Sequence, residues 1–180
     1  DIEDIKKSNK MIDITSEATR SITESSKFKV EGLSIENQIS VANYIRDYLN
    51  NPTHAGELIP MVASLTNNGI VAQITEYNDA ILRRQKLLEN SSERNPVIQD
   101  MDNVLAAVRR SIIASLNSHV STLEIQLSNM RKEEALANHR ISTMPSQEKV
   151  LLDIMRQQKI KEELFLYLLN KQEETQLNYA

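Results

Sequence analysis

The sequence predicts an all-α protein: an elongated antiparallel bundle of long, coiled-coil-like helices that forms a single domain over residues 1–180. Three glycines, four prolines, two phenylalanines and no tryptophan are too few turn formers and bulky residues for a compact sandwich or an α/β fold. Leu, Ile, Ala, Glu, Gln, Lys and Arg are instead abundant, as in long helices. The apolar residues recur in steps of three and four, and no stretch alternates convincingly as a strand does.

The first long helix is predicted over residues 15–50, after a short helical tail at residues 1–8 and a turn at residues 9–14. Gly32 falls inside this helix, where glycine costs about 1 kcal/mol relative to alanine. Two interpretations are open: a break at Gly32 that gives two helices, or one helix with a closely packed glycine. We favour one helix, because the apolar stripe stays in phase across Gly32.

Residues 51–68 are predicted to form a long connection that packs along the helices. Pro52, Gly56 and Pro60 prevent a regular helix there, and the intervening apolar residues are too many for a free linker. The next helix is predicted over residues 69–90.

The longest helix is predicted over residues 96–143. Asn95 can cap its first backbone N–H groups, and Pro96 suits the first helical position. No further glycine or proline occurs before Pro145, so at 1.5 Å per residue the helix would be about 70 Å long. Two four-residue steps around Leu116 form a stutter, which locally relaxes a left-handed supercoil.

Met144 and Pro145 interrupt this helix, and a last helix is predicted over residues 146–179. It contains six consecutive apolar residues, Leu164 to Leu169, which cover every side of a helix. The run is far shorter than the roughly 20 residues that a bilayer requires. We therefore expect protein to surround it on several sides, or the run to lie where this chain meets something larger.

The residue types of catalytic and ligand-binding sites are scarce or scattered. The absence of cysteine excludes disulfides, thiolate zinc sites and cysteine nucleophiles, and the three histidines lie far apart in the sequence. The net charge of -4 has both signs interspersed, which argues against nucleic acid as a partner. Arg83–Arg84 and Arg109–Arg110 could hold an anionic group, although exposed helix arginines are the simpler interpretation. We predict a non-catalytic segment without cofactor or metal.

Three stretches resemble motifs of one protein family, in the same order along the chain. Residues 13–18, Asp-Ile-Thr-Ser-Glu-Ala, resemble the Val-Asp-Leu-x-x-Glu-Ala entry to its first long helix. Residues 92–96, Ser-Glu-Arg-Asn-Pro, resemble the polar turn that opens its longest helix. Residues 144–180 resemble its final extracytoplasmic helix, with a Met-Pro break and a Tyr-x-x-Leu-Leu-x-Lys-x-x-Glu-like segment. The family is the chain-length determinants, or polysaccharide co-polymerases, here the Wzc-type bacterial tyrosine autokinases in Bacteroides-like versions.

The resemblance implies a parent protein anchored in the inner membrane, with a helical periplasmic region above an α/β base. A cytoplasmic tyrosine kinase domain that uses ATP and Mg²⁺ would follow outside this chain. The start at Asp1 and the end at Ala180 lead us to expect a fragment that lacks the base. The implied partners are further copies of the protein, a polysaccharide polymerase, an outer-membrane export protein and the polysaccharide itself.

The resemblance and the apolar run together give the candidate motif or interface residues. These are Asn95, Pro96, Met144, Pro145, Leu164, Phe165, Tyr167, Leu168, Leu169 and Lys171. The expected function is a periplasmic scaffold that controls the chain length or export of exopolysaccharide or capsule. The alternatives are a ligand-sensing helical bundle of a sensor or chemoreceptor and the helical hairpin of an efflux adaptor, which would need flanking β sequence.

Overall fold

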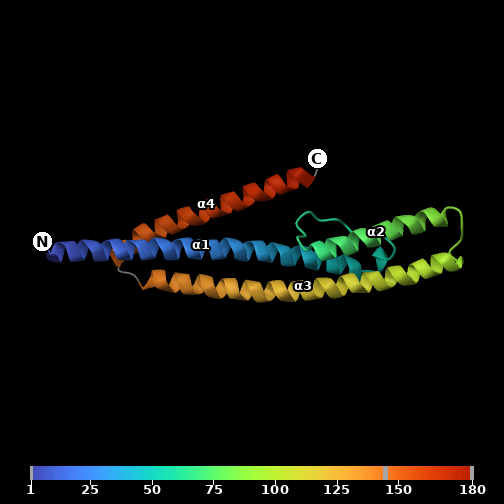
Figure 1. The fold of residues 1–180 in the computed structure, drawn as a ribbon, viewed down its shortest axis with the longest axis horizontal. Helices are drawn as coiled ribbons and strands as arrows, with labels where there is room; N and C mark the ends of the chain where they lie inside the picture. Colours follow the sequence, from blue (N-terminus) through green and yellow to red (C-terminus); the bar gives the residue numbers. More distant parts are fainter. Residues whose placement is uncertain (1, 144–145, 179–180) are drawn as a thin grey trace. The chain divides into compact units, whose positions relative to one another are not determined.

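The fold is all-α, as predicted, with long helices that pack against one another (Figure 1). The structure is a computed structural model that describes residues 2–143 and 146–178, with side chains described for residues 16–143 and 153–174. No strand occurs among the described residues. The helices are α1 (Ile2–Asn50), a short 3-10 helix (Pro52–His54), α2 (Asn68–Leu88), α3 (Pro96–Ser142) and α4 (Ser146–Asn178).

Residue contacts divide the chain into two compact units. Unit 1 combines residues 1–35 with residues 125–180, and unit 2 comprises residues 36–124. The two units pack their helices with different kinds of side chain.

Helix α1 is continuous from Ile2 to Asn50. The predicted turn at residues 9–14 is therefore wrong: this stretch is helical, and it contains neither the glycine nor the proline that would force a turn. The preference for one helix through Gly32 is confirmed. A β-carbon built on the buried Gly32 would lie 3.7 Å from Leu127 Cδ1, an ordinary van der Waals contact. The packing at this position therefore does not require glycine.

Unit 2 is a three-helix arrangement around a large apolar core. Helices α2 and α3 are antiparallel, since Asn67 contacts His119 near one end and Arg84 contacts Asp102 near the other. The core takes residues from all three helices and from the connection between α1 and α2. Its buried members are Ala42, Ile45, Leu49, Ile59, Leu65, Ile70, Ile74, Tyr77, Ile81, Leu105, Ile112, Leu116 and Val120.

The connection at residues 51–67 packs on the helices in part, as its composition suggested. Ile59 and Leu65 are buried, whereas Leu58 and Met61 are exposed. Asn78 on α2 accepts a hydrogen bond from the Ile59 N–H at 2.8 Å and donates one to the Ile59 carbonyl at 2.9 Å. One amide side chain thus satisfies both backbone groups of a buried residue in an irregular segment.

Unit 1 joins the first part of α1 to the last part of α3 through small side chains. Ser25 donates to Asn138 at 2.7 Å and Arg140 pairs with Glu24 at 3.0 Å, so the two segments run antiparallel. Met155 of α4 packs against a small apolar cluster between them. The buried residues along this contact are Ala18, Ser21, Ile22, Ser25, Ser26, Gly32, Leu127, Ala137 and Ile141.

Candidate interaction surface

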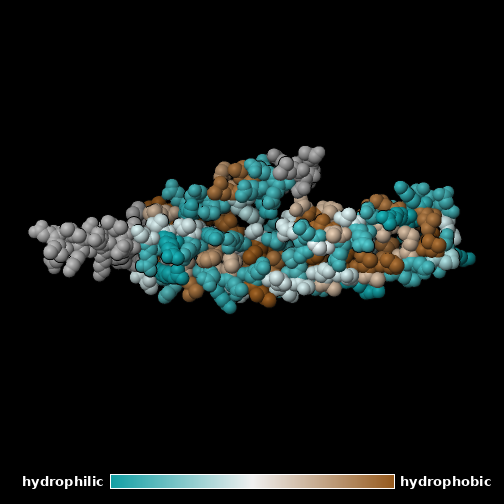
Figure 2. Space-filling model, in the orientation of Figure 1, coloured by the Kyte–Doolittle hydropathy of each residue, from teal (hydrophilic) through white to brown (hydrophobic). Residues whose placement is uncertain are grey.

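The apolar run on α4 is the most exposed group of large hydrophobic side chains in unit 1. Phe165 is 65% exposed and Leu168 63%, and Leu166 and Leu169 are also exposed. Figure 2 shows the corresponding hydrophobic patch on the middle of α4. Among the described residues, protein does not surround the run on all sides.

Helical spacing separates the run into two faces. Ile154 is 60% exposed and lies eleven residues before Phe165, which is three turns, so both project from the same side of α4 as Leu168. Leu164 and Tyr167 lie on another side and are half-buried. We call the residues Ile154, Phe165, Leu166, Leu168 and Leu169 the exposed apolar face of α4.

Charged side chains lie before and after the Phe165–Leu169 part of this face along α4. Lys159 pairs with Glu162 at 3.2 Å and with Glu163 at 3.5 Å, and Lys171 pairs with Glu174 at 2.8 Å. The hydrogen bond to Glu162 raises the pKa of Lys159. The side chains of these pairs are half-exposed to exposed, so the pairs contribute little to stability, and they place charges on both sides of Phe165–Leu169 along the helix.

Asn95 and Pro96 have a local structural role in unit 2. The Asn95 side chain accepts a hydrogen bond from the Val97 N–H at 2.9 Å and donates one to Ser91 Oγ at 2.7 Å. Pro96 is the first residue of α3, where a missing N–H costs no hydrogen bond. Both residues therefore determine where α3 begins. Met144 and Pro145 lie outside the described residues.

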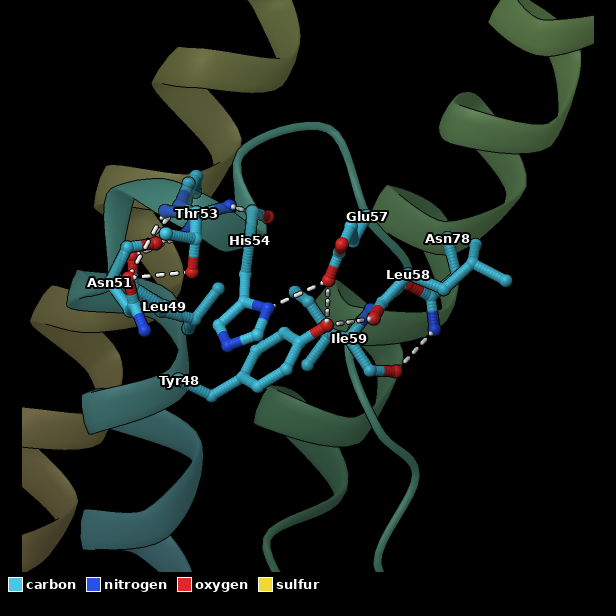
Figure 3. A network of polar contacts seen from close by, with 10 residues as sticks. Tyr48, Leu49, Asn51, Thr53, His54, Glu57, Leu58, Ile59 and Asn78 are labelled. Atoms are coloured by element: carbon cyan, nitrogen blue, oxygen red, sulfur yellow. Dashed lines mark hydrogen bonds and ion pairs between the residues drawn. The ribbon is translucent and has the colours of Figure 1, made fainter.

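A polar cluster at the end of α1 was not anticipated from the sequence (Figure 3). His54 Nδ1 lies 2.7 Å from Glu57 Oε2, and the Tyr48 hydroxyl lies 3.0 Å from the same oxygen and from the Leu58 carbonyl. A carboxylate only accepts hydrogen bonds, so His54 Nδ1 and the Tyr48 hydroxyl are the donors to it. The rings of Tyr48 and His54 stack with centroids 4.1 Å apart.

Two pKa shifts follow from this cluster. The hydrogen bond from His54 and then that from Tyr48 lower the pKa of Glu57, because both stabilise its charged form. Burial and the neighbouring Glu57 carboxylate raise the pKa of Tyr48. The cluster holds the start of the connection against the end of α1.

Of the four arginines considered as anion ligands, two are exposed and two already bind other groups of the protein. Arg84 makes a two-pronged pair with Asp102, with Nη2 3.0 Å from Oδ2. Arg109 donates from Nε to the Leu49 carbonyl and from Nη1 to the His54 carbonyl, both at 2.9 Å. Arg109 thus satisfies the Leu49 carbonyl at the carboxyl end of α1, where a cation is favourable, and the His54 carbonyl at the end of the 3-10 helix. Arg83 and Arg110 are exposed, as the simpler interpretation has it.

Comparisons with known proteins identify no relative: the chain matches no family model, no curated protein and no solved structure. Within the described part of the chain, no helix is both long and apolar enough to cross a membrane. The same residues contain no cluster of three or more side chains that could hold a metal ion.

Proposed function

We propose that this chain is a non-catalytic interaction scaffold, and that the exposed apolar face of α4 binds another protein surface. The observation that supports this most is the exposure of four neighbouring large side chains, Phe165, Leu166, Leu168 and Leu169, with charged side chains before and after them along α4. A contiguous apolar patch with a polar border is typical of protein–protein contact sites.

The size of the face indicates what kind of association it supports. Fully burying a side chain of this type yields about 1.5–3 kcal/mol, and these four are already partly covered. Association itself costs about 4–15 kcal/mol in lost freedom of motion. The face alone therefore gives a weak contact, which becomes effective when a membrane anchor or several copies raise the local concentration.

The full proposal joins this surface to the sequence resemblance. The chain would be the periplasmic helical region of an inner-membrane Wzc-type tyrosine autokinase that controls the length or export of exopolysaccharide or capsule. Its partners would be neighbouring copies, the polymerase and the outer-membrane export protein. Catalysis with ATP and Mg²⁺ would belong to a kinase domain outside this chain.

The test uses the intact parent protein in its own bacterium. Leu168→Glu places a charge in the centre of the exposed apolar face without touching a buried side chain, so the fold should persist. We expect an altered length distribution of the surface polysaccharide on gels and fewer chemically crosslinked copies in the membrane.

The matched control is Val104→Glu, because Val104 is also a helical apolar residue and is 59% exposed, but lies in unit 2. It should leave both readouts unchanged. A strictly monomeric parent, or normal polysaccharide with Leu168→Glu, would contradict the proposal.

A further inference from the structure

The first two residues of α2, Asn68 and Gly69, form the only asparagine–glycine pair in the sequence. Such a pair can react within itself. The backbone nitrogen of the glycine loses its proton to solvent and attacks Cγ of the asparagine side chain, and the side-chain nitrogen takes up a proton and leaves as ammonia. Water then opens the resulting succinimide ring at either carbonyl, so asparagine and water become aspartate or isoaspartate and ammonia. Glycine favours the attack, because it has no side chain to crowd the nitrogen and few restraints on its backbone.

Both reacting groups of this pair are accessible and free of hydrogen bonds. Asn68 and Gly69 are exposed. The first N–H groups of a helix have no acceptor within the helix, and the N–H of Gly69 finds no other acceptor among the described residues. The Asn68 side chain also makes no hydrogen bond within the described part of the chain. The attacking nitrogen and the side chain that it attacks are therefore both available.

Two other exposed asparagines precede a small residue, but the backbone nitrogen that follows each of them is occupied. The Ser91 N–H, after Asn90, donates to the Leu88 carbonyl at 3.3 Å. Ser118, after Asn117, lies in the interior of α3, where the N–H bonds to the carbonyl four residues earlier. Attack at these two sites would first require the loss of a backbone hydrogen bond. Of the three sites, the start of α2 is the one whose nitrogen is free.

The cap of α2 controls how often the pair reaches the reactive geometry. Ring closure requires the backbone to rotate at ψ of Asn68, away from its helical value, so that Gly69 N approaches Cγ. Asn67 Oδ1 accepts a hydrogen bond from the Ile70 N–H at 3.1 Å, and the Asn67 carbonyl accepts one from the Val71 N–H at 3.0 Å. Rotation at Asn68 breaks both bonds. The first turn of α2 must therefore open before the reaction, and Asn67 is the residue that holds it closed.

We propose that Asn68 is a site of spontaneous deamidation that is controlled by the opening of the first turn of α2. The two products act on the helix in opposite directions. Aspartate adds a negative charge to a first turn that has no acidic residue, where the helix dipole favours it. Isoaspartate adds a backbone carbon between the Asn67 cap and the buried Ile70, which displaces the cap and loosens the start of α2. The inference is independent of the α4 surface, which Leu168→Glu tests separately.

The test incubates the whole chain in mildly alkaline buffer at physiological temperature. Peptide mapping by mass spectrometry measures the conversion of each asparagine, and an isoaspartyl methyltransferase labels the isoaspartate product. Asn68 should convert at least about tenfold faster than Asn90 and Asn117, which serve as controls within the same sample. An Asn68 that stays intact, or equal conversion at the three positions, would overturn the proposal.

Three variants separate the reaction from its control by the helix cap. Gly69→Ala should slow conversion of Asn68 at least about tenfold, because the added methyl group crowds the attacking nitrogen. Asn67→Ala should speed it about fivefold, because loss of the cap favours opening of the first turn. Asn95→Ala is the matched control: it removes the cap of α3 instead and should leave the rate at Asn68 unchanged.

Circular dichroism checks that the helices persist in each variant. An unchanged rate in Gly69→Ala would rule out attack by this nitrogen. An unchanged rate in Asn67→Ala, or equal acceleration by Asn95→Ala, would show that the cap of α2 does not control the reaction.

Discussion

Units 1 and 2 use the same long helices but pack them with different side chains. Unit 2 buries isoleucines and leucines from three helices and adds polar contacts that hold an irregular connection in place. Among the residues of unit 1 whose side chains are described, the buried ones are mainly serine, alanine and glycine, with one small apolar cluster around Ile22 and Ile141. Small side chains remove little apolar area from water, so unit 2 should hold most of the stability and unit 1 should open more readily. The less stable unit is also the one that presents the exposed apolar face.

The largest expected effect comes from truncating the core of unit 2. Ile112→Ala removes a side chain with no exposure from a dense cluster and should lower the free energy of unfolding by about 2–5 kcal/mol. Ile141→Ala on the same helix, in unit 1, should lower it less, because among the described residues the cluster around Ile141 contains only Ala18, Ile22 and Met155. Urea denaturation followed by residue-resolved hydrogen exchange measures both changes. If Ile141→Ala lowered the free energy of unfolding as much as Ile112→Ala or more, the proposed difference in stability between the units would be wrong.

Arg109→Ala should have the next largest effect. It leaves the carbonyls of Leu49 and His54 without their charged donor, which should cost about 1.5–3 kcal/mol. Arg110→Ala, an exposed neighbour, should change stability by no more than about 0.5 kcal/mol. Thermal unfolding of the two variants side by side measures the difference, and similar melting temperatures would show that Arg109 does not hold the end of α1.

Gly32→Ala should stabilise unit 1 by about 0.5–1 kcal/mol. Alanine lowers the entropy of the unfolded chain, and the added methyl meets Leu127 at a normal distance. Gly69→Ala is a useful comparison, because its β-carbon would lie only 3.3 Å from Asn67 Oδ1, the atom that caps α2. Gly69→Ala should therefore raise the free energy of unfolding by less than Gly32→Ala does. A loss of stability with Gly32→Ala would mean that the contact between α1 and α3 around Gly32 is more tightly packed than the distance to Leu127 indicates.

The smallest effect concerns the pH dependence of the Tyr48–His54–Glu57 cluster. The pKa of Glu57 is lowered in the folded chain, so its contribution is fully present above the ordinary carboxyl pKa and is lost as the pH falls through the lowered value. The stability difference between the parent chain and Glu57→Gln should therefore shrink as the medium is acidified. Denaturant titrations across the acidic range measure it, and a difference that grows towards low pH would contradict this assignment.

Much of the fold was predictable because prolines and apolar spacing are local signals. Pro52, Pro96 and the repeating three- and four-residue steps gave the helix order and most helix ends correctly. The prediction of a turn at residues 9–14 was wrong because polar residues on a helix surface resemble those of a turn. The run Leu164–Leu169, of which Phe165, Leu166, Leu168 and Leu169 are exposed, was evident in the sequence as more apolar surface than one helix face can bury.

The polar contacts could not be predicted in the same way. Arg109 meets the carbonyl of Leu49, which is 60 residues away in sequence, and Asn78 binds the backbone of Ile59. Such pairs depend on the register between helices, which a single sequence does not reveal.

Site-specific photo-crosslinking in the intact parent protein tests most directly whether the exposed face of α4 is a protein contact. A photoreactive phenylalanine analogue would replace Phe165, with the same analogue at Val104 as the control position. If α4 is the contact surface, position 165 gives a crosslinked product and position 104 does not. Equal crosslinking at both positions, or none at position 165, would contradict that role.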